Sequence, residues 1–166
     1  MSELALPDLF SEAMSHMASG VAVITARRTN DGEPCGLAAT AVVSYSAAPP
    51  SLLVSVGHSS RCHAHLEVCE HFEVHILGAD QEDLARRFAA KGDDKFADLA
   101  WDWDHDVPVL ADPLAYLRCR RAENFDRYDH TILVGDIAGG RVDSGEPLLY
   151  ARRRMDWALQ PGGDPL

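Results

Sequence analysis

The amino-acid sequence predicts a mainly β protein, an antiparallel barrel into which a few helices are inserted. The chain has 166 residues, 46% of them hydrophobic, which is enough for one domain with one core. Short runs rich in β-branched residues recur along it. Helical patterns separate only some of these runs, so the regular strand–helix alternation of a doubly wound parallel sheet is missing.

The N-terminal region predicts a helix followed by a hairpin. Apolar residues at positions 9–17 lie at helical spacing, and Gly20 ends the helix. Residues 21–27 form a strand rich in β-branched side chains, and a second strand runs from 35 to 43. Between them, Asp31-Gly32 is a strong signal for a hairpin turn.

The middle of the chain alternates breaks, strands and helices. Residues 44–50 end in two prolines and predict a break, because proline donates no ladder hydrogen bond. Residues 51–56 are almost wholly apolar, which predicts a strand buried on both faces. A short helix capped by Ser59 or Ser60 follows this strand, and residues 72–77 form the next strand.

The second half predicts one helix, an irregular excursion and several strands. Asp80 caps a helix over 81–90, and residues 91–108 follow as irregular chain. From 114 to 149 the pattern returns to strands, and the last strand candidate lies within 148–159.

The charge balance narrows the partners. The formal net charge is −11, from 15 Lys and Arg against 26 Asp and Glu. This argues against a nucleic acid or an anionic membrane as partner, since both attract a basic patch. Any phosphate site must be built locally from backbone N–H groups and a few basic side chains. With no signal peptide, no long apolar run and no CxxC pair among four cysteines, we expect a cytoplasmic protein with reduced thiols.

Several motifs that carry nucleotide or hydrolase chemistry are missing. The sequence has no GxGxxG, no GxxxxGK[ST], no GxSxG and no HExxH. A nicotinamide cofactor would therefore have to bind without a dinucleotide-binding domain.

Four blocks in order carry a family resemblance. They are MASGVAVITARRTNDGEPCGLAATAVVSYSAAPPSLLVSV, GHSSRCHAHL, DQEDLARRFAAKGDDKF, and DHTILVGDI followed by PLLYARRRM. Together they resemble the flavin reductase-like family, the small reductase components of two-component flavin-dependent monooxygenases. The resemblance implies one domain over 1–166, with a core of about 10–159. Its fold would be an FMN-binding split β-barrel of antiparallel Greek-key type.

The resemblance also implies an activity. The chain would be an NAD(P)H:flavin oxidoreductase that transfers hydride from NADH or NADPH to FMN or FAD. It would be a homodimer with flavin near the subunit interface, and it would supply reduced flavin to a partner monooxygenase. The alternative is a flavin-binding carrier without NAD(P)H turnover.

The family's flavin-binding segments map onto residues of this chain. One strand runs along the flavin ring at Ala38, Ala39 and Thr40, where small side chains allow close backbone approach. The turn that holds Ser44 and Ser46 would lie near the ribityl phosphate, although a plain serine-rich turn explains these residues equally well.

Two further segments provide candidates for flavin contacts. Ser59, Ser60 and Arg61 open a predicted helix and form a phosphate candidate, with a plain helix cap as the competing interpretation. The family uses the second segment to cover the flavin, which here gives Phe88, Lys91, Lys95 and Phe96. The competing interpretation is core phenylalanine and solvated lysine.

The catalytic candidates are Asp129 and His130. In the family a Gly-Asp-His triplet opens a barrel strand and places the histidine beside the nicotinamide, and here Tyr128 replaces the glycine. His130 would bind the nicotinamide amide or move a proton, and Asp129 would orient its ring. Tyr150 and Arg152 would close the nicotinamide pocket, or belong to a basic surface strand.

Three other functions compete with this one. The first is a zinc site. Its ligands would be Cys62, His65 and Cys69, which lie at helical spacing on one helix face, together with neighbouring histidines, although His63 points away from this face. A pyridoxal-phosphate-related oxidase shares a similar barrel but needs a basic phosphate cluster that is not evident here. A non-enzymatic interaction domain would bind no flavin.

Overall fold

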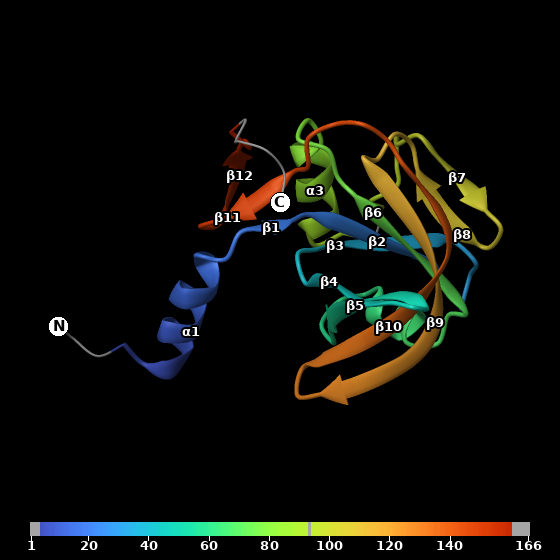
Figure 1. Ribbon diagram of the computed structural model, residues 1–166. Helices are drawn as coiled ribbons and strands as arrows, with labels where there is room; N and C mark the ends of the chain where they lie inside the picture. The colour runs from blue at the N-terminus through green and yellow to red at the C-terminus, as the bar shows by residue number, and fades with distance from the viewer. Residues whose placement is uncertain (1–3, 93, 161–166) are drawn as a thin grey trace.

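The computed structural model describes residues 4–92 and 94–160. Its helices are α1 (Leu6–Ser15), α2 (His63–Leu66) and α3 (Glu82–Ala89). The strands, shown in Figure 1, are β1 (Ser19–Gly20), β2 (Ala22–Arg27), β3 (Pro34–Ala39), β4 (Val42–Ala47), β5 (Pro50–Gly57), β6 (His71–Ile76), β7 (Trp101–Asp104), β8 (Val107–Leu110), β9 (Ala115–Arg127), β10 (His130–Val142), β11 (Leu149–Ala151) and β12 (Arg154–Trp157).

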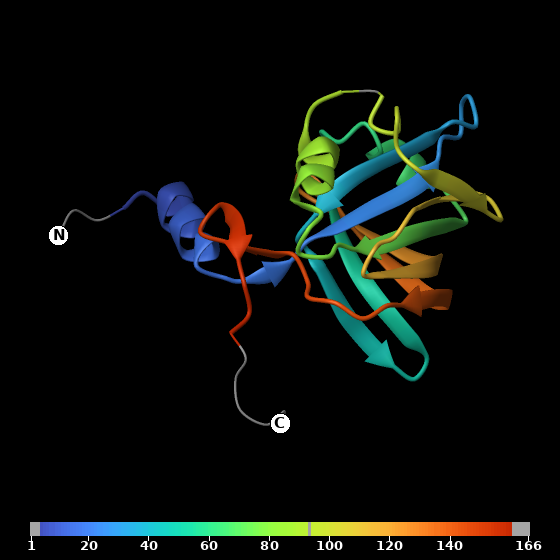
Figure 2. The same cartoon turned by 90° about the horizontal axis from the view of Figure 1, so that it is seen from above.

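One curved antiparallel sheet dominates the molecule. Its seven strands follow the order β3-β2-β6-β9-β10-β5-β4, and every neighbouring pair is antiparallel. The two edge strands, β3 and β4, follow one another in the chain. The sheet therefore curls so that its edges approach each other, but no hydrogen-bonded ladder joins β3 to β4 (Figures 1 and 2). The prediction of a mainly β, antiparallel fold with inserted helices is confirmed.

Two buried clusters hold the sheet. One contains Ile24, Val54 and Phe72 and fills the concave side of the sheet together with Leu66 of α2. The other packs α3 onto the sheet through Val23 and residues such as Phe88. Strand β2 contributes to both clusters, and its residues 22–26 are all buried. The prediction of burial on both faces fits β2 better than residues 51–56. There Ser51 and Leu52 are both buried, but from Leu52 on buried and half-buried residues alternate.

A separate arm extends from the sheet. Strands β1, β11 and β12 form a small three-stranded sheet, and α1 precedes it (Figures 1 and 2). No residue of α1 is buried, and Leu6 and Phe10 are 80% and 68% exposed. The helix therefore presents apolar side chains that the described part of this chain does not cover.

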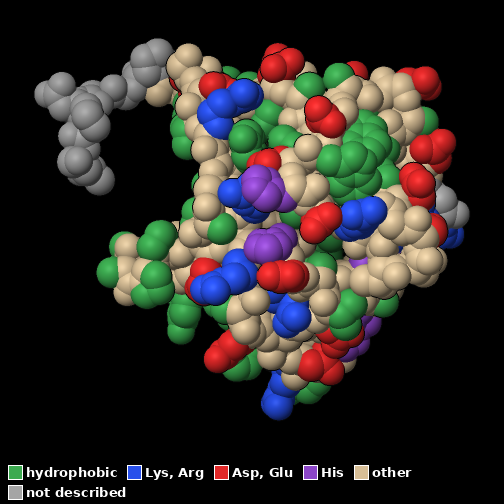
Figure 3. All heavy atoms as spheres, turned by 90° about the vertical axis from the view of Figure 1, so that its right-hand side faces the viewer, with side chains coloured by type: hydrophobic (Ala, Val, Ile, Leu, Met, Phe, Trp, Pro, Cys, Tyr) green, Lys and Arg blue, Asp and Glu red, His purple; other side chains and the backbone are tan. Residues whose placement is uncertain are grey.

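The segment predicted to be irregular contains a hairpin. Strands β7 and β8 pair antiparallel, with His105 at φ 59° in the turn. The sequence pattern did not predict these strands. Acidic and aromatic residues alternate in β7, and two successive residues, Asp102 and Trp103, are both exposed. Figure 3 shows the side of the molecule that carries this hairpin, where acidic, basic and histidine side chains are interspersed.

Five local predictions need correction. The strand predicted over 35–43 is divided between β3 and β4, and Gly20 lies in β1, after α1 has ended at Ser15. Strand β4 includes Ser44 and Ser46, so the predicted break lies only at the Ala48-Pro49 turn. Helix α2 is a single turn with Cys62, not a serine, at its N-cap. Gln81, not Asp80, occupies the N-cap of α3. In the described ranges, no helix has both the length and the apolar character to cross a membrane.

Candidate functional site

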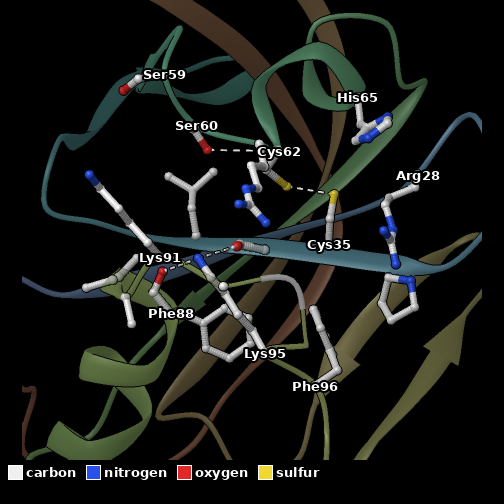
Figure 4. Close-up of a pocket in the computed structure, with 18 of the residues that line it drawn as sticks. Arg28, Cys35, Ser59, Ser60, Cys62, His65, Phe88, Lys91, Lys95 and Phe96 are labelled. Atoms are coloured by element: carbon white, nitrogen blue, oxygen red, sulfur yellow. Dashed lines mark hydrogen bonds between the residues drawn. The ribbon is translucent and has the colours of Figure 1, made fainter.

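A pocket of about 690 Å³ opens beside the edge strand β3 (Figure 4). One wall is formed by β3, a second by the turn between β5 and α2, and a third by the end of α3 and the loop that follows it. The lining side chains labelled in Figure 4 include Ser59, Ser60 and Lys91 on one side, and Arg28 and His65 on the other.

The charge of the pocket opposes the charge of the chain. Arg28, Arg61, Lys91 and Lys95 line it, and none of its described lining residues is a carboxylate. The chain as a whole carries a net charge of −11. A second cavity of about 410 Å³ is instead lined by four acidic residues. The first pocket thus concentrates positive charge locally and favours an anionic ligand.

The turn between β5 and α2 presents hydroxyl groups to this pocket. The Ser60 backbone N–H donates to the Gly57 carbonyl at 3.0 Å, and the Ser60 carbonyl accepts from His63 at 3.1 Å. The Ser60 hydroxyl oxygen accepts from the backbone N–H of Cys62 at 3.3 Å, so its O–H can donate to a ligand. Ser59, Ser60 and Arg61 all line the pocket, where the sequence predicted a phosphate site.

A buried threonine anchors this turn to the β9–β10 hairpin. The Thr131 hydroxyl, fully buried, donates to Asp126 at 3.0 Å and contacts His63 Nε2 at 2.8 Å. His58 Nε2 lies 2.7 Å from the same Asp126 oxygen. The hydrogen bonds from Thr131 and then His58 lower the pKa of Asp126. Sequence reasoning missed this network, because it joins residues up to 73 positions apart.

The third wall is packed by aromatic rings and a lysine. The Phe88 and Phe96 ring centroids are 5.2 Å apart in an edge-to-face arrangement, and both side chains are buried as well as lining the pocket. Lys95 Nζ donates to the Phe88 carbonyl at 2.7 Å and to the Gly36 carbonyl at 3.3 Å, and burial lowers its pKa. Lys95 therefore ties α3 to β3, whereas Lys91 is exposed at the rim.

Gly36 explains how closely α3 approaches β3. A Cβ atom placed at Gly36 would lie 2.6 Å from Phe88 Cε1. That is far inside van der Waals contact, so any larger residue would push the Phe88 ring away. No local pattern in the sequence indicates this contact.

His130 and Asp129 lie next to the pocket rather than in its lining. His130 pairs with Gly57 in the sheet, and Gly57 lines the pocket. A Cβ at Gly57 would stand 3.4 Å from His130 Nε2. Asp129 Oδ1 lies 2.9 Å from His130 Nδ1, and this hydrogen bond lowers the pKa of Asp129.

Tyr128 keeps the backbone conformation that a glycine would favour. Its φ is 54°, in the left-handed region that side chains other than glycine adopt rarely. The side chain is 85% exposed and stacks under Arg127, 4.5 Å from the guanidinium carbon to the ring centroid. In this chain the tyrosine preserves the turn and points outward, so it does not narrow the pocket.

The structure separates six of the predicted cofactor residues from the pocket. Ala38 lines it, but Ala39 points into the core and Thr40 is exposed beyond β3. The remaining four lie on β4 or in the arm and are absent from the lining: Ser44, Ser46, Tyr150 and Arg152. Conversely, the lining includes Arg28, Cys35, Cys62 and His65, which sequence reasoning had not assigned to a flavin site.

The arm residues have local partners. Tyr150 pairs with Ser19 and packs against the α3 cluster. Arg152 donates its backbone N–H to the Ser15 carbonyl at 2.6 Å and reaches His16 with its side chain. Among the described residues, no group of three or more His, Cys, Asp or Glu side chains is arranged to hold a metal ion.

Comparison with known proteins gives a family match over most of the chain. Residues 14–158 match the family model described as the flavin reductase like domain. The reductase component of a 4-nitrophenol 4-monooxygenase/4-nitrocatechol 2-monooxygenase from Rhodococcus opacus is 39% identical over 146 residues, which are 88% of this chain and 78% of that protein. An NADH-dependent FMN reductase from Agrobacterium fabrum is 38% identical over 143 residues, covering 86% and 80%.

A solved structure shows the same similarity in three dimensions. An NADH:FAD oxidoreductase from Streptomyces globisporus, in complex with NAD and FAD fragments, superposes with a TM-score of 0.88 at 28% identity. The match covers 98% of this chain and 100% of that one.

Proposed function

The chain belongs to the flavin reductase-like family, and we propose that the pocket beside β3 is the flavin site of an NADH:flavin oxidoreductase. The observation that carries the proposal is the set of four cations, without a lining carboxylate, in an otherwise acidic chain. Relatives named as NADH-dependent flavin reductases support the choice of nicotinamide. The activity is flavin reduction by a reduced nicotinamide nucleotide, with FMN or FAD as acceptor.

The volume and the lining of the pocket support a flavin nucleotide as its ligand. Its volume of about 690 Å³ lies in the usual range for sites of cofactor size. The hydroxyl groups of Ser59 and Ser60, with Arg61 and Lys91, would hold the phosphate. The backbone and small side chains of β3 around Ala38 would lie along the ring, and Phe88 and Phe96 give the third wall an apolar surface.

Residues next to the pocket would position the nicotinamide and move the proton that follows hydride transfer. When bound, the flavin supplies the redox chemistry by accepting a hydride from the nicotinamide. His130 Nε2 faces Gly57 at the rim, where it would accept a hydrogen bond from the nicotinamide amide. Asp129 accepts from the other ring nitrogen and so fixes the orientation of the imidazole.

The proposal extends to assembly and to a partner. The reductase components among the relatives support a role in supplying reduced flavin to a separate monooxygenase. We further propose a homodimer, supported by the uncovered apolar side chains of α1 and by exposed Val43 and Tyr45 on edge strand β4. The four free cysteines support a reducing compartment such as the cytoplasm.

NADH and NADPH oxidation, followed with FMN, FAD or no flavin, tests the activity directly. We expect oxidation that requires flavin and proceeds faster with NADH. Flavin binding without oxidation would assign the chain to the carrier class instead. A sedimentation measurement tests the dimer, and Phe10→Asp in the exposed face of α1 should shift it toward the monomer.

The role of His130 has its own test. His130→Gln should lower kcat by about tenfold or more, because it removes a positioned acceptor that can also carry a proton. The matched control is His105→Gln in the exposed β7–β8 turn, which should leave kcat unchanged. Equal rates for the His130→Gln variant and the wild type would remove His130 from the mechanism.

A further inference from the structure

Two cysteines meet in the wall of the pocket. Cys35 on β3 and Cys62 at the N-cap of α2 are 27 positions apart, yet their sulfur atoms lie 2.6 Å from each other (Figure 4). Both residues line the pocket. Cys62 is buried and Cys35 is half-buried, so the pair combines a protected sulfur with one that solutes can reach through the pocket.

The two sulfurs have different acidities. The Cys62 S–H donates to Cys35, and this hydrogen bond, with the Arg28 charge nearby, lowers the pKa of Cys35. The same bond and burial raise the pKa of Cys62. A cysteine with a lowered pKa beside a thiol that retains its proton is the arrangement of an oxidisable pair, since the thiolate is the nucleophile.

The other two cysteines, Cys69 and Cys119, differ from this pair in acidity and in position. Burial raises the pKa of Cys69 and of Cys119 to about 12 in each case. Cys69 donates to the Leu66 carbonyl at 3.3 Å, and Cys119 lies fully buried in the core. Neither lines the pocket. They serve as internal references for a thiol that should resist oxidation.

We propose that Cys35 and Cys62 form a reversible oxidation site, at which hydrogen peroxide closes an intramolecular disulfide across the pocket wall. The Cys35 sulfur attacks one peroxide oxygen and breaks the O–O bond, which leaves a sulfenic acid on Cys35 and releases water. The Cys62 sulfur then attacks the Cys35 sulfur, the S–O bond breaks, and a second water leaves. Two thiols and one peroxide give one disulfide and two waters, and an added dithiol reverses the change.

The bridge would join two walls of the pocket. The sulfurs need to close from 2.6 Å to about 2.05 Å, a small movement for the single-turn helix α2. A crosslink that closes a loop of this length restricts the unfolded chain, which raises Tm by about 5–10 °C in a chain of this size.

Peroxide treatment of the full chain, without flavin or nicotinamide, tests this proposal independently of the reductase activity. The wild type should lose the mass of two hydrogen atoms, keep two titratable thiols, and yield a peptide that links Cys35 to Cys62. The dithiol reductant should restore four thiols. Tm of the oxidised protein should exceed that of the reduced protein by the amount given above.

Variants locate the bridge. Cys35→Ser and Cys62→Ser should each abolish the mass loss and the gain in Tm, whereas Cys69→Ser should retain both. Mapping on the wild type needs no variant, so a variant that misfolds does not affect the result. Retention of four thiols, a bridge that includes Cys69, or a sulfinic acid on Cys35 in place of the disulfide would each overturn the proposal.

Discussion

Glu73 on β6 is a buried carboxyl group without a compensating partner. It is fully buried, and neither carboxylate oxygen has a hydrogen-bond partner among the described residues. Arg118, its neighbour on β9, is instead paired with Asp104 at 3.0 Å. Burial, and secondarily the Asp104 charge, raise the pKa of Glu73 from 4.5 to about 8, against a smaller opposing effect of Arg118.

This raised pKa makes the free energy of unfolding depend on pH. Between 4.5 and about 8 the folded protein holds a proton on Glu73 that the unfolded chain has lost, so stability falls as pH rises through this window. His75 acts in the opposite direction but only at lower pH, because burial lowers its pKa from 6.5 to about 4. From pH 6.5 to 8, Glu73 should therefore cost roughly 1.5 kcal/mol, at 1.36 kcal/mol per pKa unit.

Replacing Glu73 by Gln removes this titration and preserves the shape of the side chain. Urea unfolding of both proteins at pH 6.5 and pH 8 should show the wild type losing about 1.5 kcal/mol more than the variant, or about 3–6 °C in Tm. At pH 6.5 the two should be nearly equal, because the wild-type carboxyl is then neutral. Identical pH dependence in the two proteins would refute the assignment of a neutral Glu73.

Three further predictions test the pocket and its supports. Arg61→Gln should raise KM for FMN by about tenfold, from the loss of a charge-assisted contact, whereas Arg141→Gln outside the pocket should leave it unchanged. Gly36→Ala should cost about 1–3 kcal/mol in urea unfolding, because its Cβ meets an α3 ring at 2.6 Å, and Gly92→Ala, which has open space, should cost little. Tyr128→Gly should raise stability by up to about 1 kcal/mol, by relieving φ 54°, and leave NADH turnover intact; a large gain in turnover would show that the tyrosine had blocked the nicotinamide.

Local patterns were sufficient for much of the sheet and for part of the site. The β-branched run of β2 and the Asp31-Gly32 turn predicted the first hairpin, and Gly32 takes φ 77° there. The predicted phosphate candidates Ser59, Ser60 and Arg61 also line the pocket, because they are neighbours in one short turn. The family resemblance indicated a second set that lines it: Phe88, Lys91, Lys95 and Phe96. These features depend on residues that are close in the sequence, so one sequence is enough to predict them.

The remainder depends on distant pairing. Cys35 meets Cys62 only because the curved sheet brings edge strand β3 close to the end of β5, from which α2 follows. His58 meets Thr131 only because β5 pairs with β10. Nothing in the spacing of these residues indicates their contact. The turn predicted at Ser44 and Ser46 was wrong for a related reason, because pairing with β5 outweighs the turn preference of a serine-rich segment.

The position of bound FMN in a crystal structure of the complex tests the central claim most directly. The claim predicts the phosphate within hydrogen-bonding distance of Ser59, Ser60 or Arg61, with the ring against β3 between Cys35 and Ala38. FMN bound against β4 at Ser44 and Ser46, or in the acidic second cavity, would contradict it.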